Sequence, residues 1–76
     1  MNVFWTKPAA ARLYKLPRAV QRAILDRITM ISEFPEMYPV RTHQPFAGLR
    51  YFFVRDWCVS YATADDALII LAVFHA

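Results

Sequence analysis

From Gly48 to its end the chain reads as three β-strands joined by two tight turns, and this pattern constrains the fold more than any other feature. β-branched, aromatic and aliphatic residues fill the segment, and they are interrupted by turn-forming residues at 55–56 and 64–66. The last run, residues 68–74, is apolar on both alternating faces, which predicts a central place in a sheet. A sheet that occupies more than a third of the 76 residues must be the platform on which the remainder packs.

The first half of the chain predicts one strand and two helices. Residues 2–6 are short, apolar and β-prone, and residues 9–15 are good helix formers with Pro8 suited to the first helical turn. Pro17 interrupts this helix and can open a second one, which we expect to run to about Glu33. Its apolar residues recur at three- and four-residue steps. The two helices should form a hairpin across one sheet face, and we expect the first strand to lie beside the second.

Composition favours one small domain over residues 1–76 of α+β class, with an N-terminal strand and a helical hairpin packed on a small antiparallel sheet. Hydrophobic residues make up 58% of the chain, and Gly48 is its single glycine. A domain of this size rarely gains more than about 3–5 kcal/mol from its own core. We therefore expect a partner to cover the apolar surface that remains exposed.

Positive charge is concentrated in the first half of the chain. Residues 1–41 hold seven Lys and Arg against three Asp and Glu, whereas residues 42–76 hold two against three. A basic helical half suits an anionic partner such as nucleic acid, the ribosome or an acidic protein segment. The same charges would also serve an ordinary solvated helix face, and a small basic module that binds nucleic acid or a protein is a further interpretation.

Cellular location is suggested by the cysteine content and by the lack of long apolar runs. Cys58 is the single cysteine, and a lone thiol in mid-strand is typical of a core residue in a reducing compartment. The longest apolar run, residues 67–74, has the length of a strand rather than of a membrane span, and no leader pattern opens the chain. We expect a cytoplasmic protein that has no membrane partner.

Motifs for metal, cofactor or nucleotide chemistry are missing from the sequence. One glycine cannot build a phosphate-binding loop, and His43 and His75 lack a third ligand at metal spacing, so no metal or cofactor is expected. What remains is a set of cationic and proton-transferring groups around the sheet that could cleave a phosphodiester without metal. These are Arg50, Arg55 and His75, with Arg41, His43 and Tyr61 as further members.

Several short segments, in their order and spacing, resemble the RelE/ParE superfamily of bacterial type II toxins. They are Val3 to Thr6, Ile31 to Met37, Gly48-Leu49-Arg50, Val59-Ser60-Tyr61 and a last apolar strand closed by His75. The resemblance spans the chain and implies the same helical hairpin on a small antiparallel sheet. It also implies a cognate antitoxin as partner, packed along the sheet and helices, and a homodimer is possible.

The superfamily has two activities, which imply different sites in this chain. RelE-like members are ribosome-dependent mRNA endoribonucleases, for which Arg50 would hold the phosphate and His75 would act as acid or base. ParE-like members poison DNA gyrase by binding, for which the basic helical surface of Arg12, Arg18 and Arg22 would be used. Cys58 stands where nucleases usually carry an arginine, and only Ala76 follows His75. These departures favour the ParE-like activity, with the endoribonuclease as the alternative.

Overall fold

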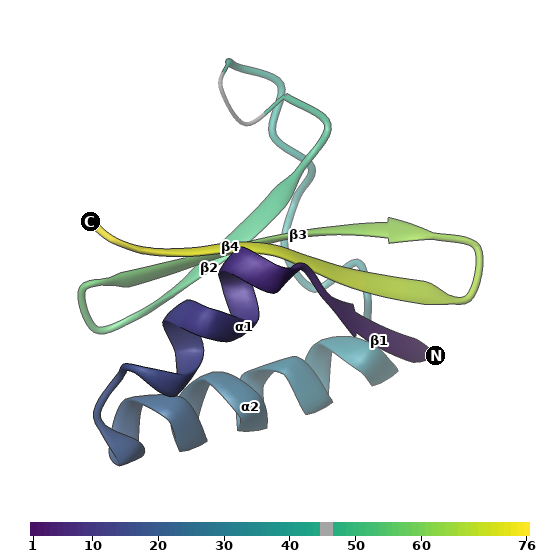
Figure 1. The fold of residues 1–76 in the computed structure, drawn as a ribbon. Coiled ribbons are helices and arrows are strands. Elements are labelled where there is room, and N and C mark those ends of the chain that lie inside the picture. The colour runs from purple at the N-terminus through teal and green to yellow at the C-terminus, as the bar shows by residue number, and fades with distance from the viewer. Residues whose placement is uncertain (45–46) are drawn as a thin grey trace.

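The computed structural model describes residues 1–44 and 47–76, and these residues form a strand, two helices and three further strands. Figure 1 shows both helices on one side of the sheet, with the two chain ends at opposite ends of it. The α+β class and the helical hairpin are therefore confirmed. The elements are β1 (Asn2–Trp5), α1 (Lys7–Tyr14), α2 (Arg18–Glu33), β2 (Arg50–Val54), β3 (Trp57–Ala64) and β4 (Ala67–His75).

The strands lie in the order β1-β4-β3-β2, with β1 parallel to β4 and the other pairs antiparallel. The expectation that the first strand lies beside the second is therefore wrong, and the sheet is mixed rather than purely antiparallel. The physical reason lies in β4, whose Leu68 and Ile70 are completely buried. The β2–β3–β4 meander covers only one edge of β4, and β1 occupies the other, so β4 takes the central place that its apolar sequence predicts.

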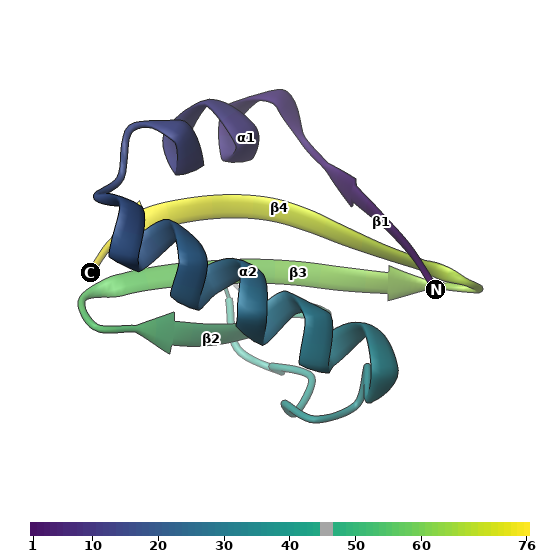
Figure 2. The same ribbon diagram turned by 90° about the horizontal axis from the view of Figure 1, so that it is seen from below.

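The core lies between the helices and one face of the sheet. The apolar stripe of α2 is buried at Val20, Ile24, Ile28 and Ile31. α1 packs on β4 and α2 on β2, so the hairpin spans the sheet (Figure 2). Burying apolar side chains at roughly 25 cal/mol per Å² is the main source of stability here. Beyond the α2 stripe, the buried apolar core consists of Ala9, Leu13, Leu16, Phe52, Val54, Val59, Tyr61, Leu68, Ile70 and Val73.

The junction between β1 and α1 is fixed by Thr6. Its hydroxyl oxygen accepts a hydrogen bond from the Ala9 amide at 3.3 Å, which caps α1, and the hydroxyl donates to the Leu71 carbonyl oxygen at 2.8 Å. Leu71 is the extra β4 residue where the β3–β4 register shifts, between the pairs formed by Ser60 and Tyr61. One threonine thus starts the first helix and ties it to the irregular point of the central strand.

Alternate residues of β2 face the two sides of the sheet. Phe52 and Val54 are buried against the helices, while Phe53 points to the opposite face and is 50% exposed. No helix of residues 1–44 and 47–76 covers that opposite face, where Phe4 is also half exposed. Within the same residues, no helix is both long enough and apolar enough to cross a membrane.

Candidate functional site

Arg50 is engaged in holding the α2–β2 connection against the sheet. It begins β2, is half-buried, and donates a hydrogen bond through Nη1 to the backbone carbonyl oxygen of Tyr38. Arg27 of α2 donates to the hydroxyl of the same tyrosine. The Tyr38 ring stacks on Phe52, with 5.7 Å between ring centroids. Two arginines therefore fix one tyrosine, and the Arg50 side chain contributes to the fold.

Tyr61, a candidate for proton transfer, is completely buried in the core opposite Arg50. No described residue lies in good hydrogen-bonding geometry with its hydroxyl. Burial raises the pKa of Tyr61, and the Arg50 guanidinium and the Tyr38 backbone amide oppose part of that shift. The phenol therefore stays protonated near neutral pH and packs as a core residue.

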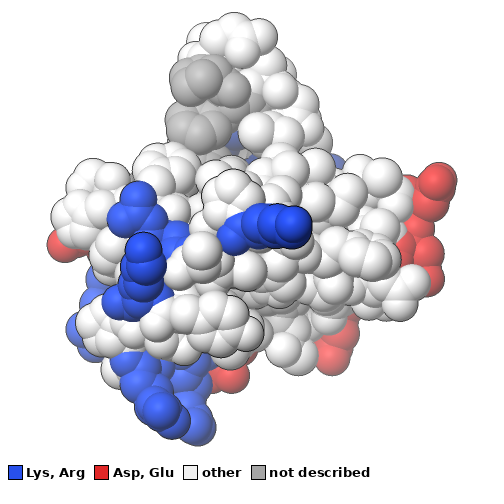
Figure 3. Space-filling view, viewed as in Figure 1, with Lys and Arg blue, Asp and Glu red and all other residues white. Residues whose placement is uncertain are grey.

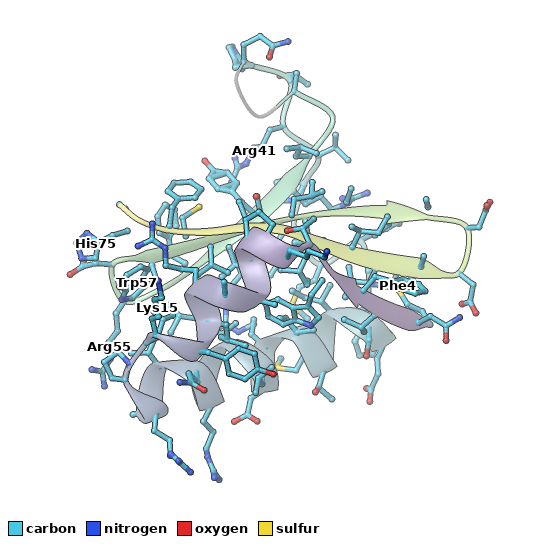
Figure 4. All side chains as sticks on the ribbon, in the orientation of Figure 1. Phe4, Lys15, Arg41, Arg55, Trp57 and His75 are labelled. Atoms are coloured by element: carbon cyan, nitrogen blue, oxygen red, sulfur yellow. The ribbon has the colours of Figure 1, made fainter. Side chains whose placement is uncertain are left out.

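His75 lies at the other end of the sheet, in contact with an aromatic ring. It is exposed at the end of β4 and pairs across the strands with Trp57. Its imidazole meets the indole edge-on, with 4.9 Å between centroids and 87° between the ring planes. From α1, the guanidinium carbon of Arg12 lies 5.9 Å from the centroid of the Trp57 ring. Figure 4 shows Lys15 and Arg55 at this same end.

The two nuclease candidates, Arg50 and His75, are not brought together. Arg50 pairs with Tyr61 and His75 pairs with Trp57, four positions apart along the intervening strand β3. At about 3.3 Å per residue and 4.8 Å per strand spacing, their Cα atoms are roughly 16 Å apart.

Both side chains belong to the helix-covered face, and the core lies between them. The row that separates them on that face is Phe52, Val59 and Val73, which pair with one another across the three strands and are all buried. A single phosphodiester could not reach both Arg50 and His75 without displacing packed side chains.

Arg18 and Arg22, by contrast, lie together on the exposed surface of the helical hairpin. With Tyr14, which is 78% exposed, they line a surface hollow at the α1–α2 junction. Leu25 also lines the hollow and is 44% exposed. The other residues lining it are Gln21 and Asp26. We call this surface the Tyr14 hollow.

The arginines of the Tyr14 hollow oppose the electrostatics of their own helix. α2 begins after Pro17 with no side-chain cap and no acidic residue in its first turn. Arg18 and Arg22 therefore add positive charge near the end of the helix that is already positive because of its dipole. The placement slightly destabilises the helix and raises the attraction of this surface for an anion.

Charge separates along the length of the molecule. Among the described residues, the only ion pair joins the N-terminal ammonium to Asp66, at 3.9 Å, so the nine Lys and Arg side chains are without carboxylate partners. On the face shown in Figure 3, Lys and Arg gather toward the end that holds the C-terminus, and the opposite end carries acidic residues without Lys or Arg, although some acidic atoms also lie beside the basic group. The β3–β4 turn, with Asp65 and Asp66, forms that acidic end.

The remaining candidates do not form a catalytic group. Arg41 lies over the Tyr51 ring at 4.1 Å, on the sheet face without helices, and Nδ1 of His43 lies 3.2 Å from the Thr42 hydroxyl oxygen. Cys58 is buried, which raises the pKa of its thiol, while Arg41 partly opposes the shift. Across residues 1–44 and 47–76, no group of three or more His, Cys, Asp and Glu side chains could hold a metal ion.

The sequence analysis does not predict the roles of two aromatic residues, Tyr14 and Tyr38. Tyr14 follows a buried helical position, Leu13, and an aromatic residue next to the apolar stripe of a helix is a signal for an exposed contact. Tyr38 lies in the proline-rich connection, where no periodic pattern predicts its packing on Phe52.

Comparisons with known proteins agree on one family. The sequence profile for the ParE toxin of type II toxin-antitoxin system, parDE, matches residues 3–76. No curated protein is detectably similar in sequence.

Solved toxin–antitoxin structures share the fold. The Escherichia coli RelBE complex contains a chain with a TM-score of 0.84 and 14% identity, covering 99% of this chain and 95% of that one. A chain of the RelBE2 complex of Mycobacterium tuberculosis has a TM-score of 0.82 and 23% identity, and the match covers 99% of this chain and 96% of that one. A chain of the chromosomal ParDE system of Pseudomonas aeruginosa has a TM-score of 0.64 and 18% identity, and the match covers 100% of this chain and 96% of that one. At these identities the likeness is one of fold.

Proposed function

The chain belongs to the ParE toxin family of type II toxin–antitoxin systems, and we propose that it inhibits growth by binding and poisoning DNA gyrase. As the toxin component of such a pair, it has a cognate antitoxin as its partner. The observation that carries the proposal is the separation of Arg50 from His75 by a buried row of core residues. General acid–base cleavage needs its groups within hydrogen-bonding reach of one reacting centre.

Binding, unlike cleavage, requires only an accessible surface of suitable chemistry. The Tyr14 hollow combines an exposed aromatic ring with two arginines that have no carboxylate partner within the described residues. Tyrosine and arginine are enriched among the residues that dominate binding energy at protein interfaces. Arg18 and Arg22 are therefore the residues we assign to gyrase contact. Arg12 lies instead against Trp57, so it contributes less to this surface.

The test is a gyrase assay with purified toxin and supercoiled plasmid. Poisoning should trap cleaved complexes, which yield linear DNA after protein digestion, and Arg18→Glu should reduce linear DNA at least tenfold. Lys7→Glu is the matched control because Lys7 is the first residue of α1, as Arg18 is of α2. Both reversals favour the helix dipole equally, so only the location of the charge differs.

Two results would contradict the proposal. Wild-type toxin that leaves gyrase unaffected but cuts mRNA on translating ribosomes would establish the endoribonuclease alternative, and Arg50 and His75 would then need reassignment. Equal loss of poisoning in Arg18→Glu and Lys7→Glu would remove the Tyr14 hollow from the mechanism while leaving gyrase as the target.

A further inference from the structure

The two β-hairpins have the same loop length but opposite charge at the same position. Val54 pairs with Trp57 and Ala64 pairs with Ala67, so each loop has two residues. The first loop residue has a positive φ in both, 53° at Arg55 and 52° at Asp65.

The positive φ suits Asp65 but not Arg55. Aspartate tolerates the left-handed region because its short side chain bonds locally to the backbone. Arginine has no such compensation, and glycine or asparagine is the usual residue at such a loop position. The β2–β3 hairpin therefore retains an arginine at the expense of backbone strain.

Nothing within the described part of the chain explains this arginine by a folded-state contact. Arg55 is exposed, and its side chain takes part in no hydrogen bond or ion pair among residues 1–44 and 47–76. Strain that no internal contact offsets is a reason to look for an external one.

Arg55 adjoins a group of cations around one aromatic ring. Arg12 lies over Trp57 and His75 meets the edge of the same ring. Figure 4 shows Lys15 and Arg55 at this end of the molecule. Here the C-terminal end of α1, the β2–β3 turn and the end of β4 lie close together. The neighbouring acid is Asp56, which forms no ion pair among the described residues and accepts a hydrogen bond from the Ala76 amide through its backbone carbonyl. We call the group of Arg12, Lys15, Arg55, Trp57 and His75 the Trp57 cluster.

We propose that the Trp57 cluster binds the phosphodiester backbone of nucleic acid, with Arg55 as a direct phosphate contact. Guanidinium groups match phosphate geometry with paired N–H donors, and unpaired exposed cations gain affinity by releasing counterions from the polymer. A peptide partner would need apolar anchor sites at the centre of its interface. Here the Trp57 ring is already flanked by Arg12 and His75, and Arg55 is exposed beside it without a carboxylate partner among the described residues.

This binding is separate from the gyrase contact, because it uses a different surface and needs no protein target. Duplex DNA would be the ligand beside gyrase, and RNA would be the ligand on a ribosome. The shared chemistry is the phosphodiester, and the two sources are separated by experiment.

The experiment measures fluorescence anisotropy of a labelled 20-base-pair DNA duplex and a labelled 20-nucleotide RNA over a salt series. Arg55→Gly should weaken binding roughly fivefold and lower the slope of log affinity against log salt by about one. The variant removes the charge and relieves the strained φ, so its thermal stability should be at least that of wild type. Lys15→Gln combined with Arg55→Gly should weaken binding further.

Asp65→Gly is the matched control, since it relieves the same φ in the other hairpin and should leave affinity unchanged or slightly higher. Affinity of Arg55→Gly equal to wild type would overturn the proposal, as would absent binding at 50 mM salt. Equal competition by polyglutamate of the same charge would also overturn it, in favour of an acidic protein partner. Tighter binding of DNA or of RNA supports it and identifies the source. Wild-type toxin that binds duplex DNA yet leaves gyrase unaffected would defeat the proposed function alone.

Discussion

The guanidinium of Arg50 donates a hydrogen bond to the backbone carbonyl oxygen of Tyr38, which ties the start of β2 to the connection after α2. Hydrogen bonds from charged donors contribute about 1.5–3 kcal/mol. Because Arg50 is only half-buried, Arg50→Ala should lower the free energy of unfolding by about 1–2 kcal/mol, as measured by urea titration. Arg50→Lys should recover part of this, since lysine keeps the charge but loses the planar fork.

Arg22→Ala is the control for that series, because Arg22 is exposed and pairs with no carboxylate among the described residues. Its stability should stay within about 0.5 kcal/mol of wild type. If Arg50→Ala proved as stable as Arg22→Ala but lost an RNA-cleaving activity, Arg50 would be catalytic rather than structural.

Tyr61→Phe should make stability less sensitive to alkaline pH. Burial raises the pKa of Tyr61 in the folded state, so above the ordinary tyrosine value of about 10 the unfolded chain loses this proton first. The stability due to the neutral phenol is complete below that pH and is lost as pH rises through the folded pKa. Urea titrations at pH 8 and pH 10.5 should show a smaller decline for Tyr61→Phe than for wild type.

At pH 8 the same variant tests whether the buried hydroxyl is satisfied. No described residue bonds it in good geometry, so its removal should be neutral or should stabilise the fold by up to about 1 kcal/mol. A loss greater than 1 kcal/mol would mean that the hydroxyl makes a favourable bond in solution.

The sequence predicts local structure well because its signals are local. Proline positions define the helix starts, and the period of Val20, Ile24, Ile28 and Ile31 identifies the buried side of α2. Strand order is different, because it depends on which edges remain free after packing. A central β4 and a β1 beside β2 are mutually incompatible predictions, and burial of Leu68 and Ile70 decides between them.

The candidate site was less predictable because its residues are distant in sequence. Arg50 and His75 are the right residue types for phosphodiester cleavage, but only the strand register reveals that core residues separate them. Likewise, counting charges identifies the basic first half of the chain. Only the strand register and the turn geometry show that Arg55, from the second half, lies beside basic residues of the first. Backbone φ values have no reliable signature at an arginine, so the strain at this turn could not have been read from residue order.

Ile24→Ala should cost about 2–5 kcal/mol, because Ile24 is completely buried between α2 and the sheet and its truncation leaves a cavity. Leu25→Ala is the matched control, since the neighbouring side chain is 44% exposed on the outer side of the helix. Its loss should be under about 1 kcal/mol by the area it buries. Denaturant midpoints compare the two, and equal losses would contradict the assigned orientation of α2.

Gly48→Ala isolates the energy of a single backbone conformation. Gly48 has a φ of +82°, and a Cβ at this position would have no atom of the described residues, its chain neighbours aside, within 4 Å, so the substitution introduces strain without a clash among them. The expected loss is about 1 kcal/mol. Gly48→Asn should lose less, because asparagine enters the left-handed region more easily. The Gly48 amide donates to the Arg41 carbonyl at 2.8 Å, so hydrogen exchange at this amide should quicken in Gly48→Ala. Equal stability of all three proteins would show that the connection relaxes to another conformation at no cost.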